Sequence, residues 1–211
     1  MKIACLLITH LPIKAEMKRN NSIAGMPVLI TVQSRYGAKV LDISPQISDV
    51  ALGMPIEQAI SRCKDAILIE ADEMYYDSVF DAIVKKLRYK SPFVEKRERG
   101  CAFVDMDKTE KIYGDDKDIA NVLLKVPHRD LEPRVGLSNS KFASYVAAFI
   151  SKACRATIIS EDVPGFLHDL SIDMLPLSWD DQARLHNFGL HSMGQIASLS
   201  VESMQDQFGV Q

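Results

Sequence analysis

The sequence predicts an α+β fold, in which a mixed sheet with helices is followed by a small all-helical region. Three observations predict it: β-branched and apolar runs alternate with helical patterns, these runs stop before Pro164, and only helical patterns follow. The chain has 211 residues, 47% hydrophobic and 25% charged, so it is long enough to bury a core. This composition excludes disordered, collagen-like and disulfide-scaffold classes.

The first part of the chain alternates strands with short helices. Pro45 closes one strand, because proline cannot extend the interior of a sheet. Pro55 is expected in the first turn of a helix, where its missing N–H costs nothing. We expect strands at 2–8, 27–32, 40–44 and 66–70, and helices at 13–19 and 56–62.

The second part continues this alternation and ends in helices. Val79, Ile83 and Leu87 share one face of an amphipathic helix, whose polar side carries lysines and arginines. Beyond Pro164 only helical patterns remain, and they are separated by Gly189, Gly194 and Gly209. We expect helices at 75–89, 117–125 and 141–155, and strands at 93–95, 101–106, 134–137 and 157–159, with a charged crossing between the first two strands.

Cysteine spacing and hydropathy bear on the cellular compartment. The four cysteines lie tens of residues apart, without the CxxC spacing typical of zinc sites, and favour a reduced cytosolic protein. Apolar stretches such as 3–8 are much shorter than the roughly 20 residues that cross a bilayer. The N-terminus also lacks the pattern of a signal peptide. We therefore expect a cytoplasmic protein without a membrane partner.

Charge is unevenly distributed along the chain. The net charge of −3 and the pI of about 6.0 do not by themselves indicate a nucleic-acid partner. However, seven basic residues stand between Lys85 and Arg99, and among them Lys85, Arg88 and Lys90 are candidates for phosphate binding. From Ser171 onward Arg184 is the one basic residue against five acidic ones. The middle of the chain is thus suited to an anion, and the C-terminal segment is not.

Five segments, in order and with nearly constant spacing, carry a family resemblance. They are IAGMPVLITV (23–32), GMPIEQAISRCKDAILIEAD (53–72), SPFVEKRERGCAFVDM (91–106), VGLSNSKFASYVAAFISK (135–152) and LHNFGLHSMGQIASL (185–199). The chain resembles the Y-family (UmuC/DinB-type) translesion DNA polymerases. The resemblance implies a palm at 1–20 and 73–163, inserted fingers at 21–72, and a helical thumb at 164–211. The family's little finger is absent, so we expect a fragment.

The resemblance also locates the family's catalytic positions, and here they are altered. The family is a DNA-directed DNA polymerase, which holds two Mg²⁺ ions through carboxylates. Its first Asp falls on Leu7, and its Asp-Glu pair falls on Gly100 and Cys101. None of the three can ligate magnesium. The segment that holds the triphosphate falls on residues 43–46, where Ile43 and Gln46 replace its Tyr and Arg, whereas Lys141 and Lys152 remain as phosphate-binding candidates.

With these metal-binding positions substituted, the chain resembles the ImuB-type branch of the family. That resemblance implies a non-catalytic adaptor of bacterial damage-induced mutagenesis, with weak, non-specific DNA contact and no cofactor. The expected partners are a sliding clamp and an error-prone polymerase, reached through the missing C-terminal region.

Two alternatives remain open. An active nucleotidyltransferase could use relocated Mg²⁺ ligands, for which Asp105, Asp107 and Glu98 are the candidates; Asp105 and Asp107 share a strand face. Alternatively, the chain is a DNA-binding module that recognises damaged or primer-template DNA by shape. In the C-terminal region, Trp179 falls where the thumb's glycine hairpin would grip phosphate, and it blocks that role.

Overall fold

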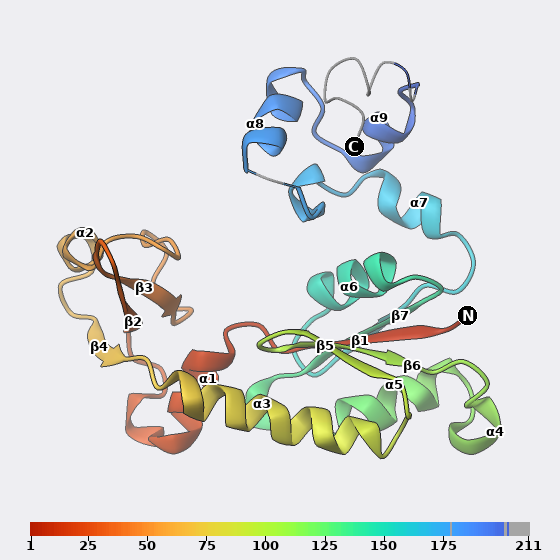
Figure 1. The fold of residues 1–211 in the computed structure, drawn as a ribbon, viewed down its shortest axis with the longest axis horizontal. Helices are drawn as coiled ribbons and strands as arrows, with labels where there is room; N and C mark the ends of the chain where they lie inside the picture. The colour runs from red at the N-terminus through yellow and green to blue at the C-terminus, as the bar shows by residue number, and fades with distance from the viewer. Residues whose placement is uncertain (178, 201, 203–211) are drawn as a thin grey trace.

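Two β-sheets and a C-terminal group of helices make up the molecule (Figure 1). The computed structural model describes residues 1–177, 179–200 and 202. The larger sheet has five strands in the order β5-β6-β1-β7-β8, and the smaller has three in the order β3-β2-β4. A mixed α+β architecture is therefore confirmed.

The larger sheet is built around a fully buried central strand. This strand, β1 (Ile3–Leu7), pairs antiparallel with β6 (Cys101–Asp105) on one side and with β7 (Arg134–Ser138) on the other. Strand β5 (Val94–Glu98) forms one edge and β8 (Ala156–Ile158), parallel to β7, the other.

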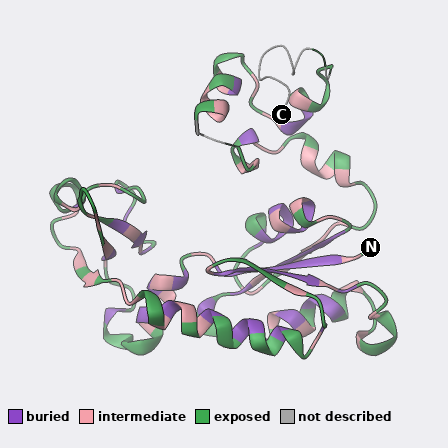
Figure 2. Ribbon diagram, viewed as in Figure 1, coloured by how far each residue is buried: buried purple, intermediate pink, exposed green. Residues whose placement is uncertain are grey.

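Helices cover both faces of this sheet, and each face has its own core (Figure 2). Helices α3 (Glu73–Arg88) and α5 (Asp116–Leu124) pack against one face, with α4 (Glu110–Tyr113) preceding α5. Helix α6 (Lys141–Ile150) covers the other face, which includes Cys5, Leu7 and Cys101. Because strand residues alternate between faces, neighbours such as Leu6 and Leu7 belong to different cores.

The smaller sheet lies at one end of the larger. It contains β2 (Val28–Ser34), β3 (Gly37–Ile43) and β4 (Ile67–Glu70), with α2 (Ile56–Arg62) packed against it. Helix α1 (Leu11–Arg19) connects the two sheets, and its Ile13 and Ala15 enter the core beneath β2. All three strands fall within the segment 21–72 that the sequence predicts as fingers.

The last described elements are helical. They are α7 (Val163–His168), α8 (Trp179–Asn187) and α9 (Met193–Ala197), and they lie on the α6 side of the larger sheet (Figure 1). A 3-10 turn at Ile172–Met174 faces α6 across a cavity of about 410 Å³. Among the described residues, no helix is long and apolar enough to span a bilayer.

The structure corrects several expected element boundaries. The helix expected at 141–155 ends at Ile150, because Ser151 is extended and its hydroxyl donates to the Ala147 carbonyl. Lys152 is therefore not helical. The charged crossing after 95 is largely part of β5, which continues to Glu98. Pro55 is the N-cap of α2 rather than a first-turn residue, and Gly194 lies inside α9. Gly209 and the side chain of Trp179 lie outside the described residues.

Candidate functional site

The positions aligned with catalytic carboxylates meet at one end of the larger sheet. Leu7 is the register partner of Cys101 on β6 and of Arg134 on β7. Leu7 and Cys101 belong to the same buried cluster beneath α6, where Leu7 is 6% exposed and Cys101 0%. The fold thus places Leu7 next to Cys101, as the family resemblance implies. Their side chains, however, are an isobutyl group and a thiol rather than carboxylates.

The third aligned position has no room for a side chain. Gly100 has a φ of +90°, and a Cβ atom added there would lie 2.4 Å from the Ile8 carbonyl oxygen. The two backbones are held together because the Ile8 N–H donates to the Gly100 carbonyl over 2.7 Å. A carboxylate at this position is therefore incompatible with the turn between β5 and β6.

A pair of thiols occupies the same face. The Cys5 and Cys101 sulfur atoms lie 3.8 Å apart, and both side chains are fully buried. The hydrogen bond between the two thiols lowers the pKa of Cys101, whereas the same hydrogen bond and burial raise the pKa of Cys5. Thiols and an isobutyl group are not the hard oxygen donors that Mg²⁺ requires, so these residues do not fit a magnesium site.

The relocated carboxylates do not converge either. A register shift in β5 pairs Glu98 with Cys101, at one end of β6. Asp105 lies four residues further along β6, about 13 Å away at roughly 3.3 Å per residue. It accepts a hydrogen bond from the backbone N–H of Asp107, whose carboxylate faces the N-terminal ammonium. No three His, Cys, Asp or Glu side chains gather as a metal site in the described part of the chain.

The nucleotide-binding positions at the end of β3 hold structural contacts. Ile43 is half-buried and Gln46 is exposed. Ser44 between them is buried, and its hydroxyl accepts a hydrogen bond from the Val28 N–H. Buried Asp42, just before them, contacts the His10 ring over 2.6 Å and accepts from the Ile13 N–H. This segment joins the two sheets through α1, a role that sequence reasoning missed.

The two lysines of the α6 segment lie at opposite ends of that helix. Lys141 begins α6 and forms an ion pair with Glu95. Lys152 follows its end, is exposed, and forms no ion pair with any described residue. They are separated by about 15 Å, the length of a ten-residue helix. Lys152 lies at the Leu7 end, because Arg134, the partner of Leu7, donates to the Phe149 carbonyl there.

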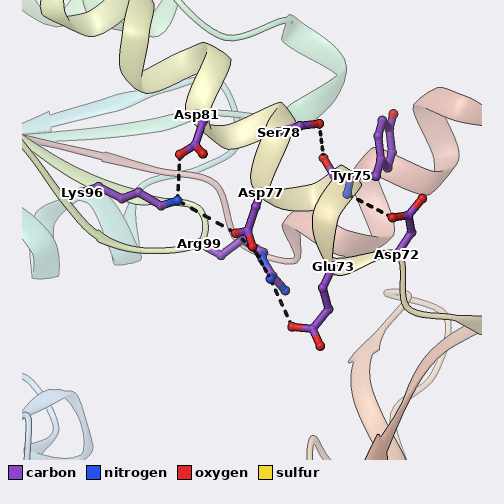
Figure 3. A network of polar contacts seen from close by, with 8 residues as sticks. All are labelled: Asp72, Glu73, Tyr75, Asp77, Ser78, Asp81, Lys96 and Arg99. Carbon is purple, nitrogen blue, oxygen red and sulfur yellow. Dashed lines mark hydrogen bonds and ion pairs between the residues drawn. The ribbon is translucent and has the colours of Figure 1, made fainter.

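The basic cluster at 85–99 does not form one surface. Lys85 and Arg88 are exposed and Lys90 is half-buried, at the end of α3, on the face of the sheet opposite Leu7 and Cys101. Lys96 and Arg99 instead face acidic residues in the N-terminal half and the middle of α3 (Figure 3). Lys96 pairs with Asp81 over 2.8 Å, and Arg99 pairs with Asp77 and Glu73. Acidic residues of α3 neutralise these two cations at the protein surface.

Sequence reasoning missed the thiol pair and the bulge beside it. Cys5 precedes Leu7 by two residues, so a strand period of two already places both on one face. Strand periodicity alone could not supply the register that brings Cys101 next to them. The sequence also does not predict the β-bulge at Arg97 and Glu98, because the charged residues there are typical of a loop.

Comparisons with known proteins agree with this geometry. The model of the impB/mucB/samB family matches residues 8–148. DNA polymerase IV of Alkaliphilus oremlandii is 24% identical over 204 residues, which cover 93% of this chain and 51% of that protein. DNA polymerase IV of Caulobacter vibrioides is 24% identical over 220 residues, covering 99% of this chain and 54% of that protein. The chain spans about half the length of the curated relatives it matches.

Solved structures show the same fold. The crystal structure of DinB from Sulfolobus solfataricus matches with a TM-score of 0.84 at 22% identity, over 99% of this chain and 63% of that one. The insertion ternary complex of Dbh DNA polymerase matches with a TM-score of 0.85 at 22% identity, over 99% of this chain and 64% of that one. At this level of identity the likeness establishes the fold.

Proposed function

We propose a function from the premise that this chain belongs to the impB/mucB/samB family, whose model matches residues 8–148. Its fold is that of the Y-family DNA polymerases. We propose that it is a catalytically inactive relative of these enzymes that acts in DNA damage tolerance. In this role it contacts DNA weakly and, within a longer protein, links a sliding clamp to a separate error-prone polymerase.

The observation that carries this proposal is the state of the three aligned carboxylate positions. Leu7 and Cys101 face each other in register without an oxygen ligand. Gly100 cannot accept a side chain, because its Cβ would meet the Ile8 carbonyl. Phosphoryl transfer by two metal ions requires hard oxygen ligands to hold both ions in place. Among the described residues, the three aligned positions supply none of these ligands, and this supports an inactive protein.

Weak DNA contact is supported by the charges that remain free. Lys152 is exposed at the Leu7 end of the sheet and forms no ion pair within the part of the chain that the structure describes, whereas Lys141 forms an ion pair with Glu95. The segment from Ser171 onward has one basic residue against five acidic ones and repels phosphate. Few phosphate contacts without base readout give low, sequence-independent affinity.

Primer extension tests the catalytic part of the proposal. The protein is incubated with a primed template, all four nucleotides and either Mg²⁺ or Mn²⁺, beside a DNA polymerase IV relative as positive control. We expect no extended primer from this chain. Extension that disappears in Glu98→Gln or Asp105→Asn would overturn the proposal and establish relocated metal ligands.

Complex formation tests the adaptor part. The full-length protein is mixed with the sliding clamp and the error-prone polymerase of the same bacterium and separated by size-exclusion chromatography. We expect a ternary complex that needs this protein to hold the other two together. Elution of all three proteins as separate species would overturn the adaptor role. That result would favour the alternative function, a DNA-binding module.

A further inference from the structure

The cavity between helix α6 and the 3-10 turn that follows α7 is not used by the proposed function. Its volume of about 410 Å³ falls within the roughly 300–1,000 Å³ typical of small-molecule sites. Phe142, Tyr145 and Phe149 of α6 line one wall, and Met174 and Leu175 line the other. The lining is therefore mainly apolar, and its few polar groups restrict what the cavity can bind.

The α6 wall is a row of aromatic rings. Its three aromatic side chains follow one another at intervals of three and four residues, so they lie along one face of the helix. The ring centroids of Tyr145 and Phe149 are 6.2 Å apart, and the ring planes are 31° from parallel. Phe149 is 44% exposed, although phenylalanine is usually buried. Uncovered rings of this kind are surfaces on which another planar group stacks.

One cation lines the cavity beside these rings. The Arg97 guanidinium lies over the Tyr145 ring, 4.9 Å from its centroid. Lys96 and Arg99, close to it in the chain, form ion pairs with acidic residues of α3. Arg97 forms no ion pair with any residue that the structure describes, so its charge remains available to a ligand. Arginine binds a phosphate through two parallel N–H···O hydrogen bonds.

The wall opposite α6 provides a hydrogen-bond acceptor. The Asp173 carboxylate lines the cavity, contacts the His186 ring over 2.7 Å and accepts from the Ser171 hydroxyl over 2.8 Å. The contact with His186 and the hydrogen bond from Ser171 lower the pKa of Asp173 below its ordinary value of 3.8. The carboxylate is therefore ionised near neutral pH, and its remaining lone pairs can accept from an N–H group of a ligand. An anionic group is repelled by Asp173 and fits at Arg97.

We propose that this cavity binds one nucleotide unit, whose base stacks on the aromatic rings of α6 and whose phosphate pairs with Arg97. A nucleotide combines the three features that the lining selects: a planar ring, an anionic group and N–H donors on the base. A free nucleotide and an unpaired nucleotide at a DNA end share this chemistry. The inference rests on the proposed function in one respect, because it gives the weak DNA contact a place on the α6 side of the sheet.

The fluorescence of 2-aminopurine tests the proposal, because stacking on an aromatic ring quenches the emission of this base analogue. The protein is titrated into the free 2-aminopurine deoxyribonucleoside monophosphate, into a duplex with one unpaired 2-aminopurine at a strand end, and into a blunt duplex with the analogue paired inside. We expect saturable quenching of the first probe, the second or both, and no further quenching of the third. Quenching of the monophosphate alone identifies a free nucleotide as the ligand, and quenching of the unpaired end alone identifies DNA.

Fluorescence anisotropy of the same duplexes, labelled with a separate dye, measures DNA binding by itself. Binding of the unpaired end without quenching of either probe would overturn the cavity as a base site and leave the weak DNA contact standing. Quenching of the monophosphate without DNA binding would overturn the DNA contact and support the cavity. Absence of quenching in all three titrations would overturn the inference whether or not DNA binds.

Two variants with matched controls locate the quenching. Phe149→Leu keeps an apolar side chain without the ring and should weaken binding of the quenched probe about fivefold or more, whereas Phe93→Leu, at an exposed position outside the cavity, should not. Arg97→Gln should remove the preference of the wild type for the monophosphate over the nucleoside, and Arg88→Gln on the opposite face should retain it. Wild-type affinity in both Phe149→Leu and Arg97→Gln would overturn the proposal.

Discussion

At the residue scale, Gly100 shows how one backbone conformation excludes a side chain. Its φ of +90° lies in the region that L side chains rarely adopt, and an added Cβ would also meet the Ile8 carbonyl. We expect Gly100→Ala to lower the free energy of unfolding by about 2–4 kcal/mol, as strain and overpacking combine. Urea unfolding monitored by circular dichroism measures this change.

A second glycine provides the control for backbone strain alone. Gly53 has a φ of +79° with no atom within 4 Å of its added Cβ. Gly53→Ala should therefore cost only the conformational part, about 1–2 kcal/mol. Equal losses for Gly53→Ala and Gly100→Ala would contradict the clash. A larger loss at Gly100 would show that this position does not accept a side chain, whether of Ala or of Asp, by substitution alone.

At the element scale, ion pairs fasten the start of α3 to the turn between β5 and β6 (Figure 3). The Arg99 guanidinium lowers the pKa of Asp77 below its ordinary value of 3.8. A carboxyl with a depressed pKa stabilises the fold above its unfolded pKa, and that stabilisation is lost as pH falls through the folded value. Asp77→Asn should therefore be less stable than the wild type near neutral pH, and the difference should shrink below pH 3.8.

Unfolding free energies measured across this pH range check the prediction. Asp81→Asn serves as the matched control, because Asp81 is on the same helix but pairs with Lys96 and not with Arg99. The effect of Asp77→Asn should also weaken at high salt, since the Asp77 side chain is partly exposed. A stability gap for Asp77→Asn that stays constant down to the acid limit would show that the carboxylate charge does not contribute.

The same elements show what the sequence could and could not predict. Periodicity located β1, α3 and α6, because each buries a regular apolar face. Periodicity predicted too long a helix at α6. The helix ends where the Ser151 hydroxyl donates to the Ala147 carbonyl and contacts the Thr157 hydroxyl. Periodicity also missed most of β5, since an edge strand with charged side chains reads like a loop. Local patterns do not encode contacts with distant segments.

At the scale of the whole molecule, the sheet separates the basic residues that the sequence offers as phosphate-binding candidates. Lys85 and Arg88 lie on the α3 face, whereas Lys152 lies beyond α6, near the row that contains Leu7 and Cys101. The aligned motifs predicted which positions meet in that row, because spacing along the chain preserves strand register. They could not predict which cations remain unpaired, since Glu95, Asp77 and Asp81 become neighbours only in the folded chain.

This division predicts which face contacts DNA. Each neutralised phosphate contributes about 0.9 to the slope of log affinity against log salt concentration. If duplex DNA lies on the α6 face, Lys152→Ala should weaken binding and reduce the slope by about one unit. Lys85→Ala, on the opposite face, removes the same charge and should leave both quantities unchanged. Fluorescence anisotropy with a labelled duplex at several salt concentrations measures the two variants side by side. A reduced slope for Lys85→Ala together with an unchanged slope for Lys152→Ala would place DNA on the α3 face, away from the row that holds the thiol pair.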